Sequence, residues 1–206
     1  SSIYPELLAG RIENRAITPD DLHPNDDGHE LVASVIIHVL EQIRVSAGME
    51  VKSDSGEAEK VPLTANAYED SIRYQNDSAV FTANGFVADQ DRQDGITDIF
   101  KNGWTANQKG ATITFEVEGS CIGIQYRKTI KLPAPVAEVV IDDDSAHAVR
   151  LDANFDETWG DKLQLDTIAE HIEKGKHKVQ ITITETHETD QLPFYLVSVI
   201  ASGKEK

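Results

Sequence analysis

An aspartate and a histidine three residues apart, Asp20 and His23, are the residues of this sequence best placed to do chemistry together. A histidine that works as a general base needs a carboxylate to orient its ring and to stabilise the imidazolium that forms. Pro24 follows directly and disfavours helical geometry at His23. The spacing therefore predicts an acid–base pair on a short loop.

A helix with one broad apolar face is expected directly after this loop. Asn25 or Asp26 can cap its first turn, where acidic residues are favoured, and Gly48 is a suitable stop. The apolar residues that recur at helical spacing are Leu31, Val32, Val35, Ile36, Val39, Leu40 and Ile43. Such a stripe predicts a helix that packs on the rest of the chain, self-associates or pairs with a separate N-terminal portion.

The loop and the start of this helix resemble the C-terminal catalytic block of the SGNH (GDSL-type) hydrolases. The matching positions are Asp20, His23, Pro24, Asn25, Gly28 and Ala33. The resemblance implies that Asp20 and His23 are the acid and the base of a Ser-His-Asp triad. Two positions depart from the commonest pattern: Asp21 stands where glycine is frequent, and His29 stands where tyrosine is also frequent. We interpret His29 as a structural residue of the first helical turn.

The nucleophile of such a triad has no candidate in this sequence. No Gly-Asp-Ser occurs, and the glycine and asparagine of the family's oxyanion hole have no counterpart. Residues 1–45 are therefore predicted to be the C-terminal segment of an α/β hydrolase domain whose N-terminal portion is missing from the sequence. A base without a nucleophile does not hydrolyse esters by the triad route, so the chain alone is predicted to be inactive.

The pattern changes to that of β-strands after a polar segment, residues 46–60, which we interpret as a linker. Strand-like runs occur at residues 111–117, 121–126, 137–141, 179–183 and 194–200, and a short helical turn is expected at 168–173. Residues 61–206 are therefore predicted to form an antiparallel β-sandwich of the jelly-roll type. The predicted fold class is mainly β, preceded by the helical remnant of the hydrolase domain.

The β-rich region is similar to the galactose-binding-like jelly-roll modules that accompany carbohydrate esterases. The positions that carry this likeness are Gly103, Trp104, Gly119, residues 140–142, Trp159, Gly160 and residues 175–179. The resemblance implies a carbohydrate ligand, and Trp104 and Trp159 are the candidate rings for stacking against a sugar. Packing in or beside the core is the alternative for each tryptophan.

Charge and composition exclude several classes of partner. The formal net charge of −17 argues against nucleic acids and anionic membranes, and no apolar run approaches the roughly 20 residues that span a bilayer. Residues 89–95 hold three aspartates near a glycine, but their spacing is not that of a calcium loop, so no metal site is predicted. No cofactor is predicted, the lone Cys121 is interpreted as a buried thiol, and both the location of the protein and its oligomeric state stay open.

These observations together predict part of a serine esterase that hydrolyses acyl esters, with acetyl groups on carbohydrate as the substrate favoured by the jelly-roll resemblance. Asp20 would orient His23, and His23 would be the general base for a serine outside the chain. The alternatives are a non-catalytic carbohydrate-binding module and a purely structural or dimerising sandwich.

Overall fold

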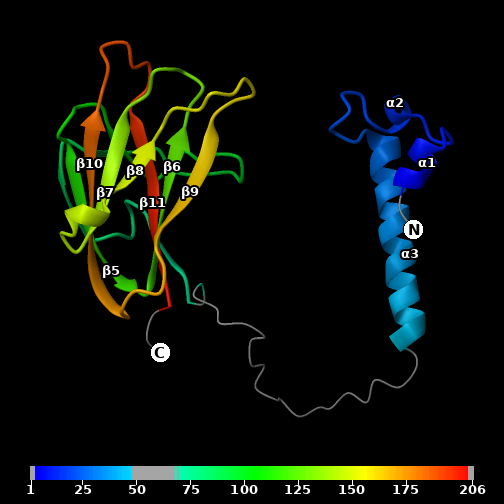
Figure 1. Ribbon diagram of the computed structural model, residues 1–206, viewed down its shortest axis with the longest axis horizontal. Helices are drawn as coiled ribbons and strands as arrows, with labels where there is room; N and C mark the ends of the chain where they lie inside the picture. Colours follow the sequence, from blue (N-terminus) through cyan, green and yellow to red (C-terminus); the bar gives the residue numbers. More distant parts are fainter. Residues whose placement is uncertain (1–2, 48–67, 69, 204–206) are drawn as a thin grey trace. The chain divides into compact units, whose positions relative to one another are not determined.

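The computed structural model describes residues 3–47, 68 and 70–203, and its contacts divide the chain into two compact units, Ser1–Val61 and Pro62–Lys206. The first unit is helical and the second is built from strands (Figure 1). Of the predicted linker, Ser46 and Ala47 form the end of a helix, and residues 48–60 lie outside the described residues.

The helices of the first unit are α1 (Tyr4–Leu8), α2 (Asn14–Ile17) and α3 (Asp26–Ala47). The long helix α3 begins where the sequence predicts, because the Asn25 side chain accepts a hydrogen bond from the Gly28 N–H at 2.9 Å and caps the first turn. Asp26 and Asp27 follow in that turn, near the positive end of the helix dipole. The predicted helix and its cap are confirmed.

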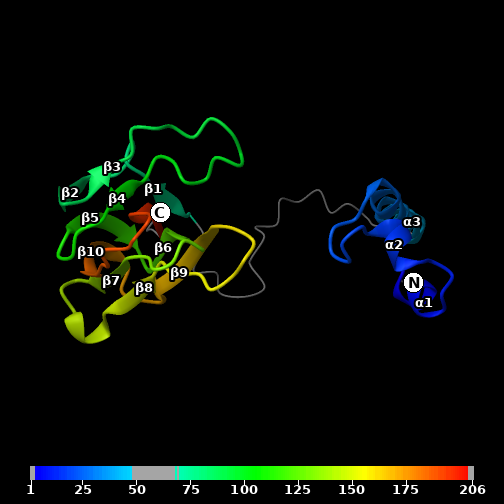
Figure 2. The ribbon, with the colours of Figure 1, turned by 90° about the horizontal axis from the view of Figure 1, so that it is seen from above.

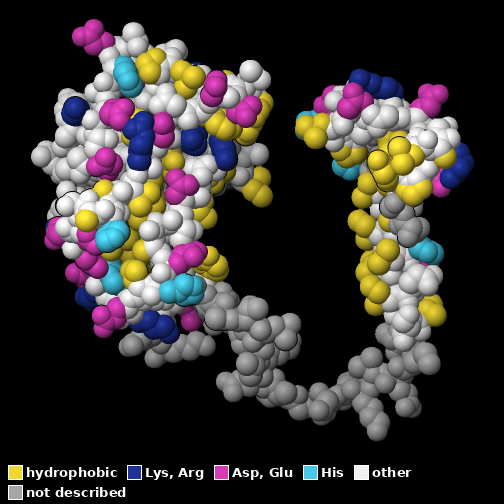
Figure 3. Space-filling model, in the orientation of Figure 1, with side chains coloured by type: hydrophobic (Ala, Val, Ile, Leu, Met, Phe, Trp, Pro, Cys, Tyr) yellow, Lys and Arg dark blue, Asp and Glu magenta, His cyan; other side chains and the backbone are white. Residues whose placement is uncertain are grey.

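The apolar face of α3 is not covered by the other described residues of the first unit. Large apolar side chains that are at least 45% exposed lie along α3, most of them on this face: Val32, Ile36, Ile37, Val39, Leu40, Ile43 and Val45. Figure 3 shows hydrophobic side chains along much of the visible length of this helix. No helix within the described part of the chain is long and apolar enough to cross a membrane.

The second unit contains eleven described strands and one short 3-10 helix. These are β1 (Ile72–Tyr74), β2 (Phe81–Asn84), β3 (Val87–Ala88), β4 (Trp104–Ala106), β5 (Thr112–Gly119), β6 (Cys121–Lys128), β7 (Val136–Ile141), η1 (Ser145–His147), β8 (Val149–Asp152), β9 (Lys162–Ala169), β10 (Gly175–Glu185) and β11 (Phe194–Ser202). Strands β5, β6, β7, β10 and β11 are the five that the sequence predicts.

The strands form two antiparallel sheets that face each other (Figures 1 and 2). One sheet has the order β3-β4-β11-β6-β9, with β1 also paired to β11, and the other has the order β2-β5-β10-β7-β8. The long segment between β3 and β4, residues 89–103, extends away from the strands in Figure 2. The predicted mainly-β fold, an antiparallel sandwich, is confirmed.

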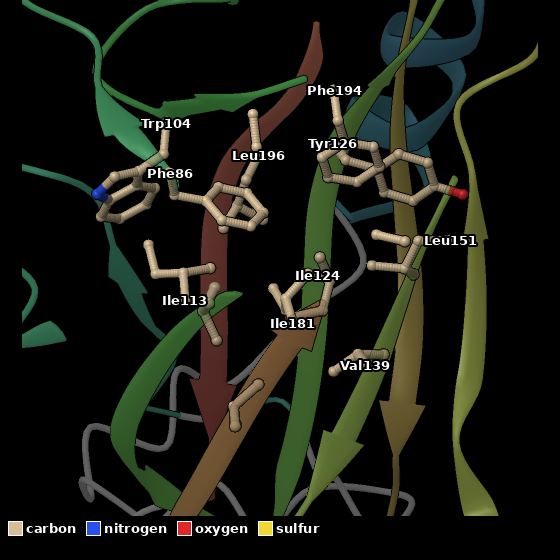
Figure 4. Close-up of a cluster of buried hydrophobic side chains, with 14 of the residues drawn as sticks. Phe86, Trp104, Ile113, Ile124, Tyr126, Val139, Leu151, Ile181, Phe194 and Leu196 are labelled. Carbon is tan, nitrogen blue, oxygen red and sulfur yellow. The ribbon is translucent and has the colours of Figure 1, made fainter. Parts of the chain in front are cut away.

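Alternating residues of both sheets fill the space between them, as the strand period requires. Strand β10 shows this directly, because Val179, Ile181 and Ile183 are buried while their neighbours are not. Within one sheet, the Tyr126 ring of β6 stacks on the Phe194 ring of the neighbouring strand β11, with centroids 5.7 Å apart (Figure 4). Cys121 is buried, as predicted.

The helical turn predicted at residues 168–173 is wrong. Ile168 and Ala169 are the end of β9, and residues 170–174 are irregular. The backbone of His171 has φ of 58°, in the left-handed region, which a right-handed helical turn does not contain. The short helix of this unit lies elsewhere, at η1.

A buried histidine near the start of β10 bonds to the residue that follows β7, at one end of the pairing between these strands. His177 Nδ1 lies 2.7 Å from Asp142 Oδ2, and its Nε2 lies 2.8 Å from the Glu173 carbonyl oxygen. Both partners are acceptors, so the ring satisfies both when it carries two protons. Burial lowers the pKa of His177, but the bonds to Asp142 and to the Glu173 carbonyl outweigh burial and leave the pKa raised.

We expect this histidine to make the stability of the sandwich depend on pH. The pKa of His177 is raised in the folded state, so its protonated ring stabilises the fold fully below the unfolded pKa of about 6.5. This stabilisation is lost as the pH rises through the folded pKa. The difference in free energy of unfolding between the parent and His177→Gln should therefore be larger at about pH 5.5 than at about pH 9. Urea unfolding at the two pH values measures it, and an equal or reversed difference contradicts the assignment.

Candidate functional site

Asp20 and His23 are hydrogen-bonded to each other, as their spacing predicts. Asp20 Oδ2 lies 2.6 Å from His23 Nδ1. The other carboxylate oxygen accepts hydrogen bonds from the backbone N–H groups of His23, at 2.7 Å, and Leu22, at 3.1 Å. The Asp20 carboxylate is therefore fixed by its own loop, and the His23 ring is held through Nδ1.

The electrostatics of the pair keep the aspartate ionised. The hydrogen bond from the His23 side chain, followed by those from the backbone N–H groups of His23 and Leu22, holds the pKa of Asp20 well below its usual range. Within the described residues, no hydrogen bond occupies Nε2 of His23, and the side chain is 74% exposed. An imidazole with a carboxylate at Nδ1 and an accessible Nε2 is suited to take a proton at Nε2.

The loop that carries the pair is tied to α2. Asn25 donates from Nδ2 to the Ala16 carbonyl at 2.9 Å and from its backbone N–H to the Ile17 carbonyl at 3.0 Å. Gly28 packs against the same place, because a Cβ there would lie 2.3 Å from the Ile17 oxygen and 2.9 Å from Pro24 Cβ. The asparagine of the motif is thus explained by its hydrogen bonds to α2, and the glycine by its close packing against Ile17 and Pro24.

The structure also bears on the two positions that depart from the usual motif, Asp21 and His29. Asp21 has φ of 65°, in the left-handed region that glycine adopts most readily, which accounts for the frequency of glycine at this position. Its carboxylate accepts hydrogen bonds from Asn14 and Arg15 of α2. His29 lies in the first turn of α3, as predicted, with its side chain exposed.

The same pair geometry recurs twice in the sandwich. Nδ1 of His147 lies 2.7 Å from Asp144, and Nδ1 of His187 lies 3.1 Å from Asp190, each across three residues. Local Asp–His pairs therefore form readily in short turns and do not identify a catalytic site by geometry alone. The surrounding motif and the similarity of the chain to known proteins must distinguish Asp20 and His23 from the other pairs.

The two candidate sugar-stacking tryptophans differ in their surroundings. Trp104 is fully buried (Figure 4). Its ring meets those of Phe81 at 5.2 Å and Phe115 at 5.1 Å, edge to face. The prediction that Trp104 contacts a sugar is therefore wrong, because β4 directs this side chain into the core. Trp159 is 67% exposed in the loop between β8 and β9, packed edge-on against Phe155 at 5.2 Å.

The acidic segment at residues 89–95 is engaged in contacts with protein groups. Asp89 Oδ2 accepts a hydrogen bond from the Tyr195 hydroxyl at 2.5 Å, and Asp91 pairs with Lys101 at 2.8 Å. These contacts tie the segment to β11 and to Lys101, which lies shortly before β4. Within the described residues, no group of three or more His, Cys, Asp or Glu side chains is placed to hold a metal ion.

No protein family model and no curated protein matches the chain. Among solved structures, a two-domain esterase (CEX) active on acetylated mannans matches with a TM-score of 0.86 and 60% sequence identity, over 100% of this chain and 54% of the esterase. The same esterase co-crystallised with mannopentaose gives the same values. A weaker likeness is found to a family two carbohydrate esterase from Cellvibrio japonicus, with a TM-score of 0.46 and 14% identity over 65% of this chain and 33% of that one.

The chain is similar over its whole length to part of a two-domain carbohydrate esterase. It spans about half the length of that esterase. The predicted resemblance to an esterase segment joined to a jelly-roll module is thereby confirmed. The likeness includes the residues around Asp20 and His23 as well as the sandwich, because it extends over the whole chain.

Proposed function

We propose that the chain is part of a serine esterase that removes acetyl groups from a carbohydrate, with Asp20 and His23 as the acid and the base of an SGNH-type triad. The observation that carries the proposal is an Asp20–His23 pair of triad geometry in a chain 60% identical, over its whole length, to an esterase active on acetylated mannans. The serine and the oxyanion-hole donors belong to a portion of the protein outside this chain.

The chemistry follows from which ring nitrogen is occupied. Asp20 holds the proton of His23 on Nδ1, so Nε2 is left to take the proton of the serine hydroxyl as that oxygen attacks the acetyl carbonyl. The imidazolium that results is stabilised by the ionised Asp20 and then gives its proton to the departing sugar oxygen. Water, activated by the same Nε2, hydrolyses the acetyl-enzyme and restores the serine.

We expect the 206-residue chain to be inert and the two-domain protein that includes its N-terminal portion to be active. Release of acetate from acetylated mannan and hydrolysis of p-nitrophenyl acetate should occur with the longer protein and stop with a serine-reactive phosphonate. The shorter chain should do neither. Phosphonate-sensitive hydrolysis by a pure 22.7 kDa species would show that the nucleophile lies in this chain and would overturn the proposal.

A second candidate function is carbohydrate binding by the sandwich without catalysis. The observation that favours it is Trp159, a large ring that is two-thirds exposed and packed edge-on against Phe155. The Lys162 ammonium lies 5.6 Å from the centre of the Phe155 ring, within the range of a cation–π contact. A held, exposed aromatic ring is a suitable platform for a sugar face.

A further inference from the structure

Asp21 has an unfavourable backbone conformation for its residue type, and it lies between the acid and the base of the proposed triad. Its φ of 65° is in the left-handed region, which glycine enters freely and other residues enter at a cost. Aspartate is among the side chains that tolerate this region when local hydrogen bonds support it. Such support is present at Asp21.

The support comes from two side chains of α2. Asn14 Nδ2 donates to Oδ1 of Asp21 at 2.5 Å, and Arg15 Nη2 donates to Oδ2 at 2.6 Å. Arg15 also donates through Nη1 to the Pro19 carbonyl, on the other side of Asp20. We call Asn14, Arg15 and Asp21 the α2 clamp. The clamp uses both oxygens of the Asp21 carboxylate, and its contacts lie on both sides of Asp20 in the sequence.

Stability is not the main consequence of the clamp. The side chains of Arg15 and Asp21 are 65% and 51% exposed, and exposed ion pairs contribute little to the free energy of folding. The geometric consequence is larger. The left-handed turn at Asp21 directs the next two backbone N–H groups, of Leu22 and His23, back to the Asp20 carboxylate.

The loop is held to α2 on the other side of His23 as well. Asn25 bonds to the carbonyl oxygens of Ala16 and Ile17. His23 therefore lies between two attachments to the same short helix, one through Asp21 and one through Asn25. Only the attachment through Asp21 acts on the residues next to Asp20.

We propose that the α2 clamp is a positioning device for the Asp20–His23 pair. Asn14, Arg15 and Asp21 act through the acid and the base and do not contact the substrate. The inference rests on the proposed esterase function, and it adds to that function a set of positioning residues that the motif does not contain.

The first test replaces Asp21 in the two-domain protein. Asp21→Ala removes the acceptors and disfavours the left-handed turn, so kcat should fall about 10-fold to 100-fold with KM changed less than about twofold. Asp21→Asn tolerates the same turn and keeps an acceptor oxygen, so its kcat should stay within about threefold of the parent. Equal kcat values for the Ala and Asn variants would overturn the clamp.

The second test uses a matched pair of exposed arginines in the same protein. Arg15→Ala removes a contact of the clamp and should let His23 move from its position. We expect kcat to fall about 10-fold, because a misplaced general base is much less effective. Arg11→Ala removes a similar exposed ion pair, to Glu6 at 2.5 Å, but leaves the loop of Asp20 and His23 untouched and should leave kcat unchanged. Equal effects of the two variants would assign Arg15 a general structural role and contradict the proposal.

A third readout does not depend on activity. The ring ¹⁵N shifts of His23 in the 206-residue chain should show the proton fixed on Nδ1, and Asp21→Ala should move them toward the tautomer mixture of a free imidazole. Full activity of His23→Ala would defeat the proposed function itself. Loss of activity in His23→Ala, with parent kcat and parent ring shifts in Asp21→Ala, would defeat the clamp alone.

Discussion

Replacing His23 by alanine in the two-domain protein is expected to lower kcat by roughly 100-fold to 10,000-fold, with little change in KM. In the proposed mechanism the imidazole takes the proton of the serine, and no other described side chain donates a hydrogen bond to Asp20 in its place. Substrate binding depends on other contacts, so the loss should appear in kcat. Initial rates of acetate release at several concentrations of acetylated mannan separate the two constants.

The chain supplies a matched control for this variant. His147 is also exposed and also bonded through Nδ1 to an aspartate three residues earlier, at 2.7 Å, but it belongs to the sandwich. His147→Ala should leave kcat and KM unchanged. A comparable loss in both variants, or full activity of His23→Ala, would mean that His23 is not the base.

Replacing Trp104 by alanine is expected to be the most damaging single change to the sandwich, at about 3–5 kcal/mol of unfolding free energy. The ring is fully buried against Phe81 and Phe115, so its loss leaves a cavity that the strands around it cannot close. Urea unfolding followed by the far-ultraviolet circular dichroism of the β-sheets measures this change. An effect below about 1 kcal/mol would contradict the buried position.

Trp159→Ala is the counterpart of this variant, and its effects should be reversed. An exposed side chain contributes little to folding, so the free energy of unfolding should change by no more than about 0.5 kcal/mol. If the sandwich binds carbohydrate through this ring, the parent chain should be retarded in gels that contain mannan and the variant should migrate freely. Equal migration of parent and variant would remove Trp159 from the binding proposal.

The parts of the fold that the sequence predicts are those in which local pattern and burial agree. The α3 helix and the core strands β5, β6, β7, β10 and β11 have apolar residues at the period of their own structure. The sequence does not predict strand β9, because at this sheet edge an apolar side chain faces solvent and a polar one faces the protein. Leu165 points to solvent, whereas Asp166 accepts a hydrogen bond from the Tyr126 hydroxyl at 2.8 Å.

The site divides in a similar way. Asp20 and His23 are brought together by bonds within four residues, so their spacing alone predicts their contact. The contribution of Asn14 and Arg15 depends on how the chain turns between α2 and the loop, and no spacing rule gives it. The burial of Trp104 depends on the pairing of β4 with β11, which lies about 90 residues further along the chain.

The strand order has a consequence for how the sandwich forms during synthesis. The last two described strands, β10 and β11, occupy central positions: β10 lies between β5 and β7, and β11 lies between β6 and β4. The ribosome therefore releases the edges of both sheets before their centres, and β1 waits for a partner strand at the other end of the unit. Strands with unpaired edges are prone to wrong association while they wait. We therefore expect the sandwich to close late, when β11 emerges.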